Sequence, residues 1–336
     1  MTGIRDVARR AGVSTATVAR VLRDSPQVSR ELSDRVREAV AELGYVPNVV
    51  ARSLSQGRTR LLGLLVPDIS NPFFAEVARG MEDGAVTRGY HVLIGSSDLN
   101  ADRERQFISS FKARLLDAIA ITPSASDAAH LKQLAVGGMP LVFVDRRLPG
   151  VRAPAVRTDN ANAAEQAVRH LVRLGHRDIA MISGPPSFET AAERVAGFRA
   201  ACRQTGIRIR RSCLRQGYLG IEGGHKAMRE ILALRPRPTA VFSFNNLLTV
   251  GALGALREDK VRVPTELSLL TFDDMSLFPY VDPPITAIAQ PGYQMGQQTA
   301  YLLLKTLENP AATHHDVVLP TDLRIRMSCA PPASRP

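Results

Sequence analysis

A run of short hydroxyl, methyl and guanidinium side chains follows a glycine near the start of this 336-residue chain. Gly12 can adopt a positive φ, and Ser14 can cap a helix that begins at about Thr15 and ends at about Leu22. The outward positions of that helix are Thr15, Ala16, Thr17 and Arg20. Side chains of these types contact base edges, and guanidinium groups also bind phosphates. The segment therefore favours recognition of DNA in the major groove.

The neighbouring elements would build a small all-α headpiece around this helix. Val7, Ala8 and Ala11 share one face of a first helix, and residues 31–44 form a third amphipathic helix that Gly44 ends. Two short helices joined at a glycine also occur in domains that never bind DNA. The charge distribution favours DNA, because the first 60 residues carry eleven arginines against six acidic residues.

From Leu61 onward, short apolar runs alternate with helical stretches. Strands are predicted at residues 61–66, 91–96, 118–121, 141–144, 179–183, 240–243 and 267–272. Helices are predicted near 74–88, 102–114, 126–136, 161–174, 190–205, 222–234, 246–258 and 292–308. This alternation is typical of parallel sheets covered on both faces. The length favours two doubly wound α/β subdomains, with a ligand cleft between them at the carboxyl ends of the strands.

The predicted elements divide the chain into three parts. These are a helix-turn-helix headpiece (1–46), a short segment with a polar linker (47–60), and an α/β body (61–336). The family resemblance given below implies that they are a DNA-binding headpiece, a hinge helix and linker, and an effector-binding and dimerisation domain. Within the last part, the N-subdomain would comprise about 61–160 and 291–319, and the C-subdomain about 161–290 and 320–330.

Motifs along the whole chain form an ordered series. In the first 54 residues they are Asp6-Val-Ala, Ala11-Gly-Val-Ser14, Thr17-Val18, Arg20-Val-Leu22, Val28-Ser29, Glu42-Leu-Gly-Tyr45, Pro47-Asn48 and Ala51-Arg-Ser-Leu54. Later ones are Asp68-Ile-Ser-Asn-Pro-Phe-Phe-Ala75, Arg88-Gly-Tyr90, His170-Leu-Val-Arg-Leu-Gly-His176, Glu193-Arg-Val-Ala-Gly-Phe198, Phe244-Asn-Asn246, Phe272-Asp-Asp274 and Asp282-Pro-Pro-Ile-Thr286. The series resembles the LacI/GalR family of bacterial transcription regulators, whose body has the periplasmic-binding-protein-like fold.

The resemblance implies that the second helix enters the major groove of operator DNA. Thr15 and Ala16 would then read bases, and Arg20 would contact a guanine or a phosphate. Ser14 and Thr17 would contact phosphates. These five residues form the major-groove part of the predicted DNA site.

The resemblance also implies a hinge helix at residues 48–55, which orders only when two copies meet on DNA. Asn48 and Ala51 lie in this segment, and Leu54 matches the side chain that inserts into a minor-groove step and kinks the duplex. Gly3 and Ala19 stand where the family often carries hydroxyl groups. Each departure is expected to remove one hydrogen bond to a phosphate.

The effector contacts that the resemblance implies come from several separate motifs. They are Phe73, Phe74, Arg146, Arg194, Leu219, Asn245 and Asp273. Asp273 would accept hydrogen bonds from ligand hydroxyls or amines, and Arg194 would donate from a forked guanidinium group. Asp159 and Asn160 follow another apolar segment and are expected to be turn residues.

The effector itself is less defined, and a sugar or a related metabolite is expected. Leu219 stands where the family often has an aromatic residue, and Asn246 follows Asn245 where it often has Asp. The absence of an aromatic residue at Leu219 disfavours a strong sugar-stacking site. Arg146 together with Arg194 could instead favour an anionic effector, such as a sugar phosphate or a sugar acid.

The implied function is a sequence-specific transcriptional regulator, expected to be a repressor, that binds a pseudo-palindromic operator as a homodimer. A small-molecule effector is expected, but no cofactor, metal or membrane. No apolar run has the length of a membrane span, so a cytoplasmic location is expected. An enzyme is not expected, because phosphate-loop, metalloprotease and nucleophile-elbow motifs are absent. The alternatives are a transporter's solute-binding protein, which the headpiece disfavours, and a sugar-modifying enzyme.

Overall fold

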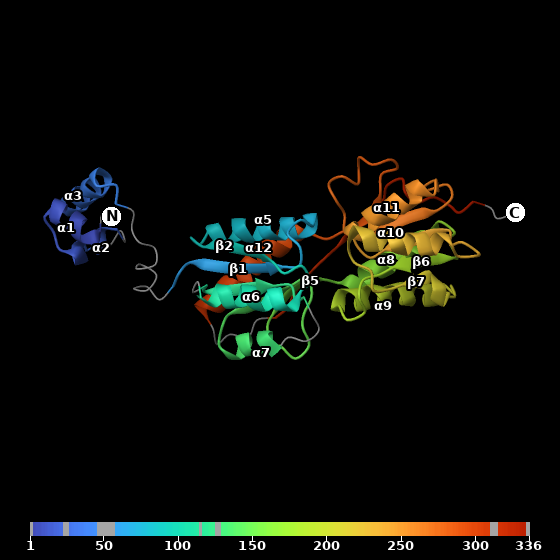
Figure 1. Ribbon diagram of the computed structural model, residues 1–336, viewed down its shortest axis with the longest axis horizontal. Coiled ribbons are helices and arrows are strands. Elements are labelled where there is room, and N and C mark those ends of the chain that lie inside the picture. The colour runs from blue at the N-terminus through green and yellow to red at the C-terminus, as the bar shows by residue number, and fades with distance from the viewer. Residues whose placement is uncertain are drawn as a thin grey trace. The chain divides into compact units, whose positions relative to one another are not determined.

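The computed structural model contains two compact units, Met1–Thr59 and Arg60–Pro336. The residues that it describes are 3–22, 27–45, 58–113, 116–124, 129–309 and 315–333. The first unit is helical, and the second contains two mainly parallel sheets with helices on both faces (Figure 1).

Among the described residues of the first unit, three helices pack around a small apolar core: α1 (Ile4–Ala11), α2 (Thr15–Val21) and α3 (Arg30–Glu42). Gly12 ends α1 with a φ of 64°, a left-handed conformation that glycine adopts at little steric cost. Val7, Val18 and Val36, one from each helix, are fully buried. The helix-turn-helix arrangement predicted from the sequence is therefore present.

The first sheet of the second unit is parallel throughout. Its strands are β1 (Leu61–Val66), β2 (His91–Ser96), β3 (Ala118–Ile121), β4 (Leu141–Val144), β5 (Ala155–Thr158) and β11 (Val317–Leu319). They lie in the order β11-β5-β4-β3-β1-β2. Helices α5 (Pro72–Val86) and α12 (Gly292–Glu308) cover one face, and α6 (Ala101–Ala113) and α7 (Ala129–Val136) cover the other (Figure 1).

The second sheet repeats this arrangement. Its strands are β6 (Ile179–Ile182), β7 (Leu214–Arg215), β8 (Ala240–Ser243), β9 (Ser268–Phe272), β10 (Thr286–Ala289) and β12 (Asp322–Arg324). Their order is β12-β10-β9-β8-β6-β7; β12 runs antiparallel to β10, and the other described neighbours are parallel. Helices α8 (Asn160–Arg173) and α9 (Glu189–Gln204) cover one face, and α10 (Gly220–Leu232) and α11 (Asn246–Glu258) cover the other. A short 3-10 helix, η1 (Arg211–Cys213), precedes β7.

Glycines allow the paired helices to approach closely. A Cβ atom on Gly80 of α5 would lie 1.9 Å from the carbonyl oxygen of Tyr293 in α12. A Cβ atom on Gly224 of α10 would lie 2.0 Å from the carbonyl oxygen of Leu248 in α11. Neither distance is sterically allowed, so both helix pairs depend on the absence of a side chain at these positions.

The chain crosses between the two sheets three times within the described residues: from β5 to α8, from β10 to α12, and from β11 to β12. The doubly wound architecture predicted from the sequence is confirmed, and so are the seven predicted strands. The structure adds β5, β7, β10, β11 and β12. Strands β7, β11 and β12 have only two or three residues and are partly exposed, so they are too short to be recognised as strands from an apolar run.

Candidate functional site

The turn before α2 fixes the start of the predicted recognition helix. The side chain of Ser14 caps α2, because its Oγ accepts a hydrogen bond from the backbone N–H of Thr17 at 3.1 Å. The Oγ atoms of these two residues are 2.9 Å apart. At the end of α1, an Nη2 atom of Arg35 donates to the carbonyl oxygen of Ala11 at 2.6 Å. The Ser14 contacts fix the start of α2, and the Arg35 contact links the end of α1 to α3.

The predicted base-reading side chains lie on the outer face of α2. Thr15, Ala16 and Arg20 are exposed, and Thr17 is partly buried by its contact with the cap. This face therefore offers hydroxyl, methyl and guanidinium groups to a partner of the headpiece. The predicted hinge residues Asn48, Ala51 and Leu54 lie outside the described residues.

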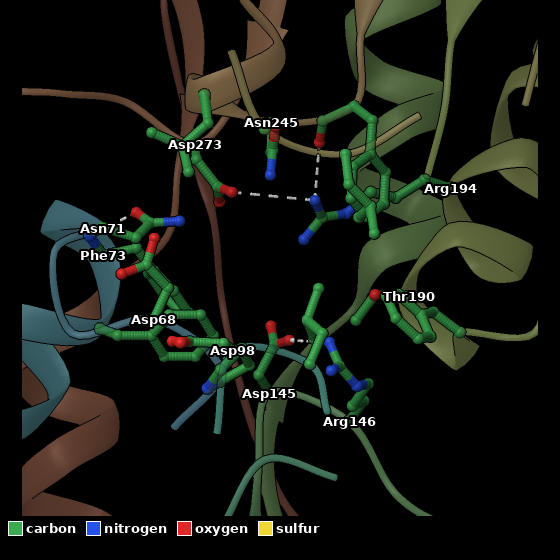
Figure 2. Close-up of a pocket in the computed structure, with 18 residues that line it drawn as sticks. Asp68, Asn71, Phe73, Asp98, Asp145, Arg146, Thr190, Arg194, Asn245 and Asp273 are labelled. Atoms are coloured by element: carbon green, nitrogen blue, oxygen red, sulfur yellow. Dashed lines mark hydrogen bonds and ion pairs between the residues drawn. The ribbon is translucent and has the colours of Figure 1, made fainter. Parts of the chain in front are cut away.

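A cavity of about 600 Å³ lies between the two sheets of the second unit (Figure 2). It is lined by the segments that follow the carboxyl ends of several strands and by the first turns of α5, α9 and α11. All seven predicted effector contacts line it: Phe73, Phe74, Arg146, Arg194, Leu219, Asn245 and Asp273. The structure thus brings together residues that are up to 200 positions apart in the sequence.

Arg194 on α9 and Asp273 after β9 form a buried ion pair on one wall of this cavity, with Nη1 and Oδ2 3.9 Å apart. The Nη1 atom also donates to the carbonyl oxygen of Phe244 at 2.7 Å, and Nε donates to Oδ1 of Asn160 at 2.8 Å. The guanidinium group stacks 3.5 Å from the ring centroid of Phe272. Burial raises the pKa of Asp273, and the charge of Arg194 opposes this shift.

Asn160 is buried at the first position of α8, so the prediction of a turn residue is wrong there. Its side chain connects Arg194 to Glu193, whose Oε2 accepts from Asn160 Nδ2 at 3.0 Å. Asp159 does act as a local capping residue, because Oδ1 accepts from the backbone N–H of Asn162.

A second buried pair, Asp145 and Arg146, comes from the first sheet, with Oδ2 and Nη1 3.6 Å apart. Arg146 Nε donates to the carbonyl oxygen of Pro123 at 2.8 Å, and its guanidinium group lies 4.3 Å from the ring centroid of Phe188. Its Nη2 atom is buried without a hydrogen-bond partner in the described structure. Burial lowers the pKa of Arg146 and raises the pKa of Asp145, while each charge opposes the other's shift.

The two aspartates of these pairs occupy equivalent places in the two sheets. Asp145 directly follows β4 and Asp273 directly follows β9, and these strands hold the same position in the strand order. Both aspartates have a left-handed backbone, with φ of 69° and 63°. This conformation is unfavourable for most side chains but accessible to Asp, and it is typical of functional loops. Figure 2 shows the two pairs on opposite sides of the cavity.

Aromatic side chains complete the walls. Phe73 and Phe74 pack edge to face with ring centroids 5.0 Å apart, and both are buried in the core while lining the cavity. Leu219, which stands in place of an expected aromatic residue, is 42% exposed. Phe188 and Phe244, which the sequence reasoning missed, stack against the two arginines. A position beside a buried guanidinium group is not visible in the local sequence.

A buried amide pair links the two sides of the cavity. Asn246 Nδ2, at the start of α11, donates to Oδ1 of Asn71, the capping residue of α5, at 2.9 Å. Asn71 Oδ1 also accepts from the backbone N–H of Phe73, so this oxygen is fixed as an acceptor. Asp68 and Asp98 line the cavity too, and neither was predicted. Asp68 and Asn71 belong to the same motif as Phe73, Asp68-Ile-Ser-Asn-Pro-Phe-Phe-Ala75. That motif could have identified them as cavity residues.

Two family models match separate parts of this chain. A model of the LacI family of bacterial regulatory proteins matches residues 3–48, and a model of the periplasmic binding protein-like domain matches residues 168–329. The HTH-type transcriptional repressor CytR of Escherichia coli is 35% identical over 97% of this chain and 95% of its own length.

Two solved structures are similar over almost the whole chain. The Lac repressor dimer bound to operator and the anti-inducer ONPF has a TM-score of 0.86 and 26% identity, with 98% of this chain and 99% of that chain covered. The complex of the transcriptional regulator CelR with cellobiose has a TM-score of 0.75 and 29% identity, with 98% and 100% covered. In the part of the chain that the structure describes, no helix is long and apolar enough to cross a membrane.

Proposed function

The chain belongs to the LacI family of bacterial regulatory proteins, and from this membership we propose that its cavity binds an uncharged, hydroxyl-rich effector of the sugar class. The protein is a DNA-binding transcriptional repressor and not an enzyme, in agreement with its relatives. Binding of the effector in the cavity controls the affinity for operator DNA.

The observation that carries this proposal is the presence of one buried Asp–Arg pair on each side of the cavity. A hydroxyl group can accept a hydrogen bond from a guanidinium group and donate one to a carboxylate at the same time. A polyol can therefore form hydrogen bonds with both pairs. An apolar ligand would displace water from the four buried charged groups without replacing its hydrogen bonds. The apolar ring faces of Phe73 and Phe74 would contact the carbon skeleton.

The charge balance disfavours an anionic effector. Two guanidinium groups line the cavity, but each faces a carboxylate, and Asp68 and Asp98 add two more acidic groups, of which Asp98 is paired with Arg103 outside the lining. A phosphate or carboxylate ligand would meet more negative than positive charge. Cellobiose, the ligand in the similar CelR structure, is uncharged and supports the same conclusion.

Control follows from the position of the cavity between two sheets. An effector that contacts Asp145 and Arg146 on one side and Arg194 and Asp273 on the other stabilises one arrangement of the two sides. The regulator acts in the cytoplasm. It acts as a homodimer, because the two headpieces of a symmetric dimer read the two halves of a pseudo-palindromic operator. The Lac repressor, a similar structure, is a dimer on its operator.

On the DNA side, Thr15 and Ala16 read base edges, and Arg20 contacts a guanine or a phosphate. Ser14 and Thr17 contact phosphates, and their mutual hydrogen bond orients both hydroxyl groups. The exposure of Thr15, Ala16 and Arg20 on one helix supports this assignment. The segment that contains Asn48, Ala51 and Leu54 is proposed as the hinge that contacts the minor groove.

The effector proposal is tested by thermal unfolding of the full chain with neutral mono- and disaccharides and with sugar phosphates. A ligand at about 100 times its Kd stabilises the folded state by about 2.7 kcal/mol, which raises the Tm by several degrees. We expect a shift with a neutral sugar, and loss of that shift in Asp273→Asn. A shift with sugar phosphates alone would contradict the proposal.

The DNA assignment is tested by selecting operator fragments from genomic DNA and then measuring the affinity of Arg20→Ala for the selected site. We expect a loss of about 5- to 150-fold, equivalent to about 1–3 kcal/mol. Arg9→Ala is the matched control, because Arg9 is 82% exposed on α1 and carries the same charge. Equal losses in the two variants would indicate general electrostatic attraction in place of recognition by Arg20.

A further inference from the structure

A second charged region lies at the C-terminal end of α9 and in the segment that follows it, whereas the effector cavity is lined by Thr190 and Arg194 near the start of this helix. No part of the proposed function uses this region. Six arginines occur between positions 199 and 215: Arg199, Arg203, Arg208, Arg210, Arg211 and Arg215. The same stretch contains no aspartate or glutamate. A charge density this high in a folded subdomain calls for a counter-charge.

Four of these arginines line a single open groove of about 1120 Å³. Arg199 and Arg203 lie one turn apart on α9, Arg211 lies in η1, and Arg215 lies on the edge strand β7. Ile207, Ile209 and Leu214 give the groove an apolar strip, and Ser212 and Gln216 add polar groups. None of these residues lines the effector cavity.

The protein itself neutralises only part of this charge. Arg215 is paired with Glu230 at 3.4 Å, yet its buried Nε has no hydrogen-bond partner in the described structure. No ion pair to a described carboxylate is present for Arg199, Arg203 or Arg211. Arg210, by contrast, does not line the groove. Its Nη2 atom forms an ion pair with Oδ2 of Asp178 at 2.9 Å.

Arg199, Arg203 and Arg211 are exposed, and an anion in the groove would relieve the repulsion between them. Like charges four residues apart on a helix repel, as Arg199 and Arg203 do here. Planar guanidinium groups bind phosphate oxygens through paired hydrogen bonds, and several of them around one groove match a ligand with several phosphoryl groups. The groove has the size of a small-molecule site, and its apolar strip can contact an uncharged part of the ligand.

We propose that this groove binds a nucleotide-sized metabolite that carries two or more phosphoryl groups. The site is independent of the proposed effector cavity and does not rest on the proposed function. It is formed by α9, η1 and β7, and Arg199, Arg203 and Arg211 supply the charges that the protein leaves uncompensated.

The proposal is tested by calorimetric titration of the full chain with adenosine triphosphate and, separately, with inorganic tripolyphosphate. Arg211→Gln removes one groove charge, and Arg208→Gln removes the same charge from an exposed position outside the groove lining. We expect Arg211→Gln to weaken binding by about tenfold or more, and Arg208→Gln to change it less than about twofold. Unchanged thermal unfolding would show that both variants are folded.

Comparison of the two probes shows whether the groove recognises the phosphoryl groups alone or also the nucleoside part of the ligand. Tighter binding of the nucleotide than of tripolyphosphate would support contact with the apolar strip, and equal binding would support recognition of the phosphoryl groups alone. Equal weakening in the two variants would overturn the proposal, and so would the absence of binding at about 1 mM. Binding of random-sequence DNA that is lost specifically in Arg211→Gln, without any nucleotide binding, would identify a nucleic-acid surface and also overturn it.

Discussion

Replacing Arg194 by methionine removes the charge on the cavity wall while keeping an unbranched side chain of comparable reach. The variant would lose the hydrogen bonds to Asn160 Oδ1 and to the carbonyl oxygen of Phe244, the ion pair with Asp273, and the stack on Phe272. Only 3% of Arg194 is exposed, so water cannot replace most of these contacts. The perturbation is therefore concentrated in one buried network.

The structure sets the expected magnitude. Removing one partner of a buried ion pair costs about 3–5 kcal/mol, because the other charge stays buried without compensation. Gln290 Nε2 still donates to Asp273 Oδ1 at 2.7 Å in the variant, which favours the lower end of that range. We therefore expect Arg194→Met to lose about 3 kcal/mol of unfolding free energy. Asp273→Asn in the same chain removes the stranded charge and should recover part of the loss, because Asn tolerates the left-handed backbone.

Equilibrium urea unfolding followed by circular dichroism measures this loss, with Arg262→Met as the matched control. Arg262 pairs with Glu266 at 3.0 Å but is 77% exposed, and exposed pairs contribute at most about 1 kcal/mol. The reasoning would be refuted if Arg194→Met were no more destabilising than the control. It would also be refuted if the double variant lost the sum of the unfolding free energies lost in Arg194→Met and in Asp273→Asn, because the two groups would then be energetically independent.

Three further outcomes are expected. Asn246→Asp removes the donor to Asn71 and places two acceptor oxygens next to each other. The free energy of unfolding, measured by thermal unfolding, should therefore fall by about 1–3 kcal/mol. An unchanged Tm would exclude an energetic role for this contact. Burial lowers the pKa of His176 below its ordinary 6.5, so the unfolded chain takes up the proton first. Stability should be full above that pH and fall below it, by up to about 1.4 kcal/mol per pH unit; a flat urea midpoint between pH 7 and about 5.5 would contradict this. Gly80→Ala should cost about 1–3 kcal/mol, because its Cβ would overlap the backbone of α12, whereas Gly254→Ala meets its nearest neighbour at 3.6 Å and should be neutral or slightly stabilising in the same assay.

The headpiece could be predicted closely because its signals are local. Gly12 and Ser14 each affect the turn or helix within three residues, and the structure has the positive φ and the side-chain cap that these residue types predict. The central strands of the body were also predictable, because they are buried on both faces and appear as mostly apolar runs. Short edge strands such as Val317–Leu319 carry no comparable signal, since the neighbouring strand determines their pairing.

The candidate cavity was only partly predictable. The positions of Arg194 and Asp273 came from motifs, but their pairing depends on a fold that joins residues far apart in the sequence. The same limit explains why two arginines suggested an anionic effector. The sequence places Asp145 beside Arg146, but it does not indicate that both would be buried and paired. The role of Asn160 was missed for the same reason, because a residue after a strand resembles a turn residue until its buried partners are known.

The three crossings between the sheets also affect the synthesis of the chain. The first sheet begins at Leu61, but the helix Gly292–Glu308 that covers one of its faces and the edge strand Val317–Leu319 come near the end of the chain. A ribosome adding about 5–20 residues per second needs of the order of ten seconds or more to supply them. During this time the apolar face of the first sheet has no α12 to cover it. The nascent regulator is therefore expected to need protection from aggregation until the second sheet has been synthesised and the chain has returned to the first.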